Sequence, residues 1–247
     1  MNYSIGIVTY IKRFEEYFKP LIQTIKSMEK DVEIIVCING EYKKKFDENY
    51  RKEILNFFSR YENIYPTFHP QFRSLSKLWN TCLINSSNKM NLILNDDITI
   101  TNKIFFENIK NLLNKSEQSF KINGSWSHTI LNREEIDFVG WFDERFLGVG
   151  EEDGDMEWRW QNKFGKNFVS FQIPGIVNHV EHKDCLENLK IVNNKYSKFN
   201  YDFSHIKYKE DKNGFNYGIM NRKLICVSET PHYHIGEKFY WENKENL

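Results

Sequence analysis

The first part of the chain alternates between short, almost wholly apolar runs and stretches whose apolar residues recur at helical spacing. The apolar runs predict strands that are covered on both faces, as in a parallel sheet. The stretches between them predict the crossover helices that parallel neighbours need. We therefore expect an α/β fold with a mostly parallel, Rossmann-like central sheet flanked by helices. The expected strands are 4–10, 32–38, 64–68 and 90–94, and the expected helices are 14–28, 47–58, 75–83 and 103–113.

The chain has 247 residues, a length that suits one α/β domain with a single large core. We expect this domain at residues 1–182, with two further short strands near its end, at 168–173 and 175–179. Residues 183–247 are polar, aromatic and weakly periodic. They predict a C-terminal extension with acceptor-side or oligomer contacts.

The charges balance, since lysine and arginine number 34 and aspartate and glutamate also number 34. Non-specific nucleic-acid binding normally uses a basic field, so we expect no nucleic-acid partner. The four cysteines lie far apart without a C-x-x-C pair, a pattern typical of reduced thiols. The N-terminus has no signal-peptide pattern, and no apolar run approaches the ~20 residues that span a bilayer. We expect a cytoplasmic protein, with at most peripheral contact with the inner face of the membrane.

Polar residues stand at the carboxyl ends of three predicted strands. They are Thr9-Tyr10, Asn39 and Asn95-Asp96-Asp97. Ligands of parallel sheets bind at these ends, so the three pieces predict one crevice. The last piece offers two carboxylates and an amide, the hard oxygen ligands that Mg²⁺ or Mn²⁺ prefers. A turn rich in Asn and Asp for purely local reasons is the alternative.

A second acidic cluster lies in residues 133–160, which hold ten acidic and three basic side chains. Its densest part precedes Met156, Trp160 and Phe164, whose spacing predicts a helix. Capping of the helix N-terminus explains one or two carboxylates. Four carboxylates within residues 151–155 exceed that need, so we expect one of them to accept a proton from a substrate hydroxyl.

Histidines follow the last predicted strand. His179 or His182 would complete a metal site, because imidazole is a usual ligand of transition metals. A hydrogen-bonded structural histidine is the alternative for each. His232 and His234 have no acidic cluster beside them in the sequence, and we interpret them as acceptor-side or structural residues.

Residues 4–182 resemble the family 2 glycosyltransferases of GT-A fold, and two motifs carry the resemblance. Residues 92–97 (LILNDD) are similar to the family's D-x-D motif. Residues 140–146 (GWFDERF) and 150–156 (GEEDGDM), followed by Arg159, are similar to the family pattern G-x-F-D-E-x-F…E-D-x-D-L-x-x-R. Spacing and residue type agree over both parts of the second pattern, which makes it the more specific of the two.

The resemblance implies which residues bind the donor and the metal. Asp97 would be the principal metal ligand and His179 the third metal contact. Asn95 and Asp96 would approach the metal or the nucleotide ribose. Ile38 stands where the family often has an Asp that contacts the base, so the nucleobase is left open. The other expected nucleotide-binding residues are Thr9, Tyr10, Asn39, Arg73 and Asn80.

The resemblance also implies an inverting transfer from a nucleotide diphosphate sugar to a hydroxyl of a glycan or lipid-linked glycan, with Mn²⁺ or Mg²⁺. Asp153 would be the catalytic base and Glu152 an acceptor-binding neighbour. Residues 148–153 (GVGEED) resemble the galactosyltransferase motif W-G-x-E-D, which favours a UDP-sugar of galactose or N-acetylgalactosamine type.

Family analogy alone suggests a bacterial surface polysaccharide as the product, either capsule or lipooligosaccharide. Two other functions are left open. One is a sugar nucleotidyltransferase, although the first predicted strand is not followed by the Gly-rich phosphate loop typical of such enzymes. The other is a catalytically silent sugar-binding or scaffold protein. A homo-oligomer is also left open.

Overall fold

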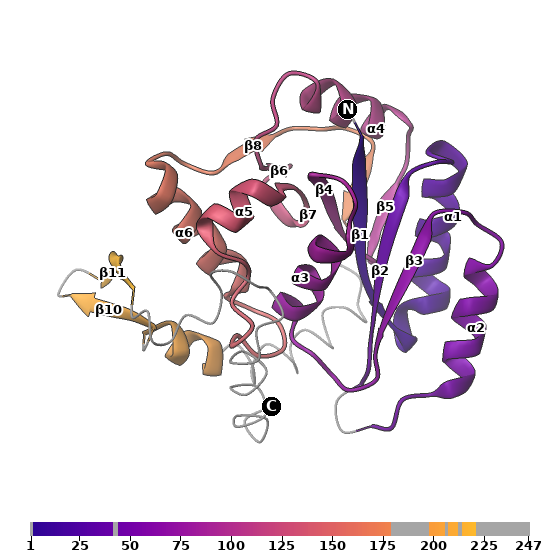
Figure 1. Ribbon diagram of the computed structural model, residues 1–247, viewed down its shortest axis with the longest axis horizontal. Helices are drawn as coiled ribbons and strands as arrows, with labels where there is room; N and C mark the ends of the chain where they lie inside the picture. The colour runs from indigo at the N-terminus through magenta and orange to yellow at the C-terminus, as the bar shows by residue number, and fades with distance from the viewer. Residues whose placement is uncertain (1, 42–43, 179–197, 206, 212–213, 221–247) are drawn as a thin grey trace. The chain divides into compact units, whose positions relative to one another are not determined.

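A computed structural model of the protein describes residues 2–41, 44–178, 198–205, 207–211 and 214–220 (Figure 1). The chain forms two compact units. Unit 1 comprises Met1–Arg73, Cys82–Arg133 and Val169–Glu181, and unit 2 comprises Ser74–Thr81, Glu134–Phe168 and His182–Leu247. The expected boundary between residues 182 and 183 lies outside the described residues, so it stays a prediction.

Unit 1 contains a seven-stranded sheet with the order β3-β2-β1-β4-β7-β6-β8. The first four strands in that order are parallel to one another, and β7 is antiparallel to β4 and β6. The α/β fold with a mostly parallel sheet is therefore confirmed. The strands are β1 (Tyr3–Tyr10), β2 (Glu33–Asn39), β3 (Ile64–His69), β4 (Met90–Asn95), β6 (Phe120–Ile122), β7 (Ser125–Asn132) and β8 (Val169–Phe171).

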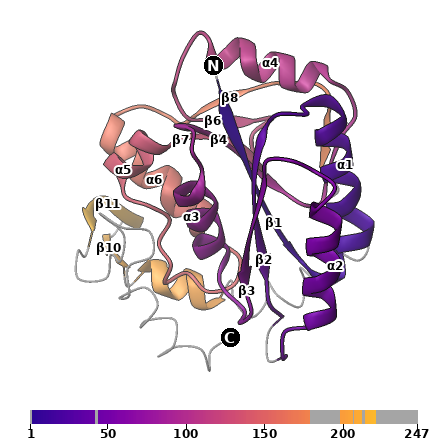
Figure 2. The ribbon, with the colours of Figure 1, turned by 45° about the vertical axis from the view of Figure 1, so that its right-hand side comes forward.

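Apolar side chains of the central strands pack into one buried core with α1 (Lys19–Met28), α2 (Glu48–Phe58) and α4 (Ile104–Leu113). The helices α1 and α2 lie side by side against the sheet in both ribbon views (Figures 1 and 2). On β1, a Cβ atom at Gly6 would lie 2.7 Å from Cβ of Cys82. Cys82 belongs to α3 (Leu75–Asn85), so this close approach of helix to strand requires a glycine.

The chain leaves β1 through an unusual helical start. A 3-10 turn (Ile11–Arg13) and a π-helical turn (Phe14–Phe18) precede α1. Phe14 and Phe18 are buried in these turns and pack edge-on against aromatic rings of α2. Single π-helical turns occur frequently at functional sites, and this one follows the carboxyl end of β1.

A small antiparallel pair joins β5 (Ile98–Ile100) to β9 (Ile176–Asn178) within unit 1. Because β4 ends at Asn95 and β5 begins at Ile98, Asp96 and Asp97 form the whole link between the two strands. The link is therefore anchored by a strand on each side.

Unit 2 contains α6 (Glu152–Phe164), most of α5 (Arg133–Val139), a helical segment at 198–205, and an antiparallel hairpin of β10 (Tyr208–Asp211) and β11 (Gly214–Met220). The sequence pattern predicted α6, and the two short strands expected at 168–173 and 175–179 are present as β8 and β9. It missed α5, β5, β6 and β7. These elements are short or lack strict apolar periodicity, so pattern alone does not separate them from loops.

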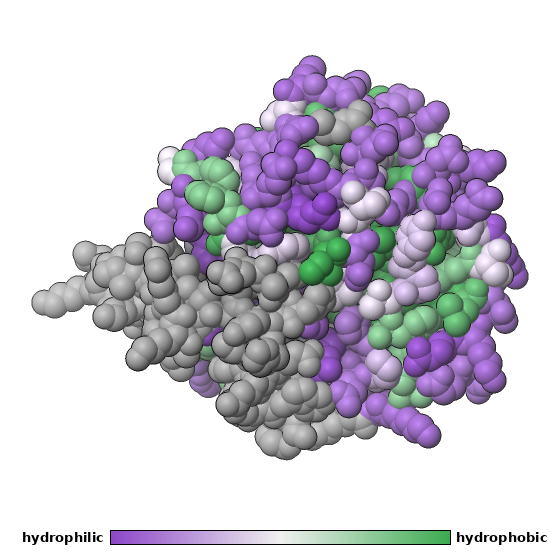
Figure 3. Space-filling view, viewed as in Figure 1, coloured by the Kyte–Doolittle hydropathy of each residue, from purple (hydrophilic) through white to green (hydrophobic). Residues whose placement is uncertain are grey.

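The surface is mostly hydrophilic on the face shown in Figure 3, with apolar side chains in small groups. In unit 1 the exposed large apolar residues include Leu55, Tyr65, Ile84 and Ile104, which come from different elements. Apolar side chains scattered in this way are ordinary for a folded protein. In the part of the chain that the structure describes, no helix is both long and apolar enough to cross a membrane.

Candidate functional site

Two adjacent carboxylates are buried in the link after β4. Asp96 is 2% exposed and Asp97 is 7% exposed. One nitrogen of Arg13, Nη1, lies 2.7 Å from Oδ1 of Asp96 and 3.0 Å from Oδ2 of Asp97. The guanidinium therefore bridges two neighbouring carboxylates whose charges would otherwise repel each other at close range.

The fold brings Arg13 to this position through strand register. Val8 of β1 pairs with Asn95 of β4, so the turn after β1 lies beside the link after β4. The guanidinium also lies 5.6 Å from the ring centroid of Tyr10 and 6.0 Å from that of Tyr17. Arg13 was not among the residues expected at this site. The available signal was a basic residue three positions after Tyr10, at the carboxyl end of β1.

The surroundings shift the pKa values of two groups at this site. Burial, reinforced by the charge of Asp97, raises the pKa of Asp96 to about 6, although Arg13 acts in the opposite direction. Burial lowers the pKa of His128 to about 4 against the opposing effect of Asp97, so this imidazole is neutral at physiological pH. His128 lies opposite Leu94 in the register of β7 on β4.

The link suits a divalent cation in the chemistry of its ligands, because carboxylate oxygens are preferred by Mg²⁺ and Mn²⁺. Oδ2 of Asp96 is buried and has no hydrogen-bond partner within the described ranges, so an oxygen ligand is available. Among the residues that the structure describes, no group of three or more His, Cys, Asp or Glu side chains is arranged to hold a metal ion. His179, the expected third contact, lies outside those residues, as do His182, His232 and His234.

The other expected nucleotide-binding residues of unit 1 lie at the same edge of the sheet. Tyr10 of β1 pairs with Asn39 of β2. The side-chain amide of Asn39 donates to the carbonyl of Arg73 at 3.0 Å and accepts from its N–H at 2.9 Å. Thr9, the residue before Tyr10, is buried. The fold therefore gathers residues that are far apart in the sequence at the carboxyl ends of β1, β2 and β4, and their contact with a nucleotide stays a prediction.

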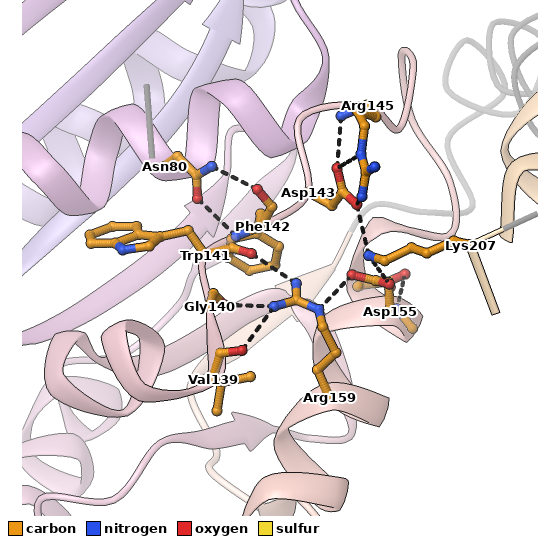
Figure 4. A network of polar contacts seen from close by, with 12 residues as sticks. Asn80, Val139, Gly140, Trp141, Phe142, Asp143, Arg145, Asp155, Arg159 and Lys207 are labelled. Atoms are coloured by element: carbon orange, nitrogen blue, oxygen red, sulfur yellow. Dashed lines mark hydrogen bonds and ion pairs between the residues drawn. The ribbon is translucent and has the colours of Figure 1, made fainter. Parts of the chain in front are cut away.

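In unit 2, two carboxylates of the second motif are held in a buried ionic network (Figure 4). Nζ of Lys207 lies 2.8 Å from Asp143 and 2.5 Å from Asp155. Arg145 pairs with Asp143 at 2.5 Å, and Arg159 pairs with Asp155 at 2.9 Å. All five side chains are buried. Asp143 and Asp155 thus serve the framework, and the C-terminal part of the chain supplies the cation that joins them.

Hydrogen bonds from Arg159, Asn80 and Asn200 to backbone groups hold the loop at 140–150. Arg159 donates to the carbonyls of Gly140 and Trp141 at 2.7 and 2.8 Å (Figure 4). Asn80 accepts from the N–H of Phe142 at 3.1 Å and donates to its carbonyl at 2.9 Å. Asn200 does the same for Leu147, with both distances at 2.8 Å.

Asn80 was expected near the nucleotide. It is fully buried, and its amide also donates to Glu144 at 3.0 Å. Lys77, one turn earlier on α3, pairs with the same carboxylate at 3.2 Å. These contacts give Asn80 a role in the framework of unit 2, and the expected contact with a nucleotide stays a prediction.

Glu152 and Asp153 open α6 in different environments. Glu151, just before them, has a left-handed backbone with φ of 71°, which is uncommon for a residue other than glycine. Glu152 is 3% exposed, and its Oε2 accepts from the N–H of Gly150 at 2.6 Å. Burial and the neighbouring charge of Asp153 raise the pKa of Glu152 to about 8. Asp153 is only partly buried, so of the two it is the carboxylate with access to solvent.

No protein-family model matches the sequence, and no curated protein matches it significantly. Solved structures are similar in fold. Mannosyltransferase PcManGT from Pyrobaculum calidifontis, in complex with GDP-Man and Mn²⁺, aligns with 98% of this chain and 71% of its own at 11% identity and a TM-score of 0.58. Glucosyl-3-phosphoglycerate synthase from Mycobacterium tuberculosis, in complex with Mn²⁺, UDP-glucose and phosphoglyceric acid, aligns with 81% of this chain and 79% of its own at 13% identity and a TM-score of 0.55.

TarS 1–349 from S. aureus, in complex with UDP, aligns with 70% of this chain at 14% identity and a TM-score of 0.53. The match covers 61% of that chain, so it extends over less than two thirds of its length. Structural similarity at identities this low shows the fold alone, so the activity has to be inferred from the residues of the site. The protein has the GT-A glycosyltransferase fold, as the resemblance of residues 4–182 predicted.

Proposed function

We propose that the protein is a metal-dependent glycosyltransferase that moves a sugar from a nucleotide diphosphate to a hydroxyl group of a glycan or lipid-linked glycan. One observation carries the proposal. A link of two buried carboxylates follows the central strand β4 of a GT-A sheet, at the edge where ligands of parallel sheets bind.

The carboxylates of Asp96 and Asp97 would hold Mn²⁺ or Mg²⁺, with His179 as a third contact. A bound divalent ion supplies positive charge that stabilises the departing diphosphate. Thr9, Tyr10, Asn39, Arg73 and Asn95 would bind the nucleotide. Neighbours in fold are solved with UDP or with GDP-Man. We favour a UDP-sugar of galactose or N-acetylgalactosamine type on the likeness of residues 148–153 to the W-G-x-E-D motif.

In this proposal Asp153 acts as the base. Its carboxylate takes the proton of the acceptor hydroxyl while that oxygen forms a bond to the anomeric carbon, and the bond from this carbon to the diphosphate oxygen breaks with inversion. Glu152, protonated at neutral pH because its pKa is raised to about 8, would donate a hydrogen bond to the acceptor. A bacterial surface polysaccharide is the product class that we propose, made at the inner face of the membrane.

A thermal-shift screen tests the proposal, because a ligand that binds the native state raises its melting temperature. UDP, GDP, CDP and their common sugars are each added with and without Mn²⁺, to the wild type and to Asp97→Asn. We expect the nucleotides of one base to raise the melting temperature of the wild type. This rise should require Mn²⁺ and be lost in Asp97→Asn. A shift with none of them would contradict a transferase and favour a silent binding protein.

Nucleoside triphosphates form a further arm of the screen, because a sugar nucleotidyltransferase binds them as substrates. The turn after β1 reads Ile11, Lys12 and Arg13 and contains no glycine, whereas triphosphate loops use glycines to bring the backbone close to the phosphates. We therefore expect a smaller shift with a triphosphate than with the matching diphosphate sugar. A larger one would move the assignment to the nucleotidyltransferases.

A further inference from the structure

Arg13 makes a contact with both acidic residues of the link that metal binding by a D-x-D motif does not require. Its Nη1 atom lies between the two carboxylates proposed to bind metal, at 2.7 and 3.0 Å. The side chain is 19% exposed, so the contact is shielded from solvent more than a surface ion pair is. A cation of the protein itself therefore already neutralises part of the charge that would attract a metal ion.

A divalent ion and the guanidinium of Arg13 would compete for the negative charge of the same two carboxylates, Asp96 and Asp97. Arginine keeps its proton in proteins, so it cannot reduce the repulsion by becoming neutral. A metal ion bound to Asp96 and Asp97 without any accompanying anion would lie close to a fixed positive charge, and Coulomb repulsion at a partly buried site is substantial. Arg13 should therefore weaken the affinity of the link for a bare divalent ion.

A nucleotide diphosphate changes this balance. A guanidinium is a planar group of donors that can bind the oxygens of a phosphate through two parallel hydrogen bonds. Arg13 lies in a short 3-10 turn directly before a π-helical turn, with its guanidinium over the rings of Tyr10 and Tyr17. A diphosphate that arrives with the metal ion offers negative charge to both cations at once.

We propose that Arg13 couples metal binding to diphosphate binding. In the free protein it bridges Asp96 and Asp97 and disfavours the bare ion, and in the loaded protein it donates to the diphosphate. Metal and nucleotide then bind together with positive cooperativity. This inference rests on the proposed function, because it takes Asp97 as a metal ligand.

The test measures the affinity for Mn²⁺ directly, from the electron paramagnetic resonance signal of the free ion, with and without saturating UDP or GDP. Wild type is expected to bind Mn²⁺ weakly alone and at least about tenfold more tightly with nucleotide, within the usual range of coupling between ligands. Arg13→Gln is expected to bind Mn²⁺ alone more tightly than wild type and to gain little from nucleotide.

Lys12→Gln is the matched control, because it removes the same charge from the same turn. Lys12 is 56% exposed and lies 3.6 Å from Glu41. It should behave as wild type. If Arg13→Gln does not fold, Arg13→Lys is measured instead; it retains the positive charge, so Mn²⁺ alone should still bind weakly, and tight binding of the bare ion would contradict the proposal.

Asp97→Asn separates this inference from the proposed function. If Asp97→Asn abolishes Mn²⁺ binding while Arg13→Gln matches wild type with and without nucleotide, the coupling role of Arg13 is wrong and the metal site stands. If Asp97→Asn binds Mn²⁺ and nucleotide as wild type does, the proposed metal site is wrong, and the role of Arg13 is wrong with it.

Discussion

Two groups of buried carboxylates, one in each unit, are held in different ways. In unit 1, Asp96 and Asp97 are bridged by one nitrogen of Arg13, and Oδ2 of Asp96 has no hydrogen-bond partner in the described part of the chain. In unit 2, Asp143 and Asp155 are paired with Lys207, Arg145 and Arg159, which are all buried. The second group is satisfied within the fold, whereas the first retains capacity for a ligand.

The comparison shows that residue type does not reveal the role of a carboxylate. Asp153 and Asp155 are two positions apart in the first turn of α6, yet Asp155 belongs to the buried network and Asp153 is partly exposed. A buried carboxylate with strong cationic partners holds a structure together. A carboxylate with access to solvent or with an available oxygen can serve chemistry.

The largest effect on stability is expected from breaking the network of unit 2. Asp155→Asn leaves Arg159 and Lys207 without one of their buried anionic partners, and loss of one member of a buried pair costs about 3–5 kcal/mol. Asp97→Asn leaves Arg13 paired with Asp96 and removes the repulsion between two adjacent carboxylates, so we expect a smaller loss than in Asp155→Asn. Urea unfolding measures both. Equal losses in the two variants would remove the distinction between the groups.

The next largest effect is on the rate and concerns Asp153. Removing a positioned general base lowers the rate by ~10²–10⁴, so Asp153→Asn should reduce sugar transfer by that factor. Its free energy of unfolding should stay close to that of wild type, because Asp153 lies outside the ionic network. Transfer rates and urea curves are recorded on the same preparation. A variant that transfers sugar normally would exclude Asp153 as the base.

A pH dependence of stability is expected from Glu152. Its folded-state pKa is raised to about 8 from the ordinary value of 4.5, so the folded state holds the proton more tightly than the unfolded state. The stabilisation is fully present below about pH 4.5 and is lost as the pH rises towards 8. Glu152→Gln should therefore lose less stability than wild type between pH 5 and pH 8. If the melting temperatures of wild type and Glu152→Gln change with pH in the same way, Glu152 is not the titrating group.

The smallest effect is expected from removing the cation of the C-terminal segment. Lys207→Met leaves Asp143 with Arg145 and Asp155 with Arg159, so the loss is that of hydrogen bonds to charged groups, about 1.5–3 kcal/mol. Lys198→Met is the control, in the helical segment 198–205 that precedes Lys207, since its pair with Asp202 is 78% and 53% exposed and such pairs contribute ~0–1 kcal/mol. Equal unfolding curves for the two variants would show that Lys207 does not stabilise the network.

The fold could be predicted because its signal is local. Apolar runs such as residues 90–94 predict strands to within a few residues. Apolar residues at helical spacing predict the helices that cover these strands. The acidic link was also predictable, since Asp96 and Asp97 directly follow such a run. The short strands β8 and β9 lie within the expected strands 168–173 and 175–179, whereas β5, β6, β7 and α5 gave no comparable periodicity.

The partners of the carboxylates could not be predicted, because they are distant in the sequence. Arg13 lies 83 positions from Asp96, and Lys207 lies 52 positions from Asp155. No local pattern distinguishes these basic residues from the others of the chain. Only the register of β1 on β4, and the folding of the C-terminal segment within unit 2, assign them to their carboxylates.

We propose that the link of Asp96 and Asp97 uses a divalent ion to act on a nucleotide diphosphate sugar. The most direct measurement is release of nucleoside diphosphate from UDP- and GDP-sugars by wild type and Asp97→Asn, with Mn²⁺ or with a chelator. We predict release from one donor class that requires Mn²⁺, is lost in Asp97→Asn and persists in Lys12→Gln. Release that continues with the chelator or in Asp97→Asn, or no release from any donor, would contradict the claim.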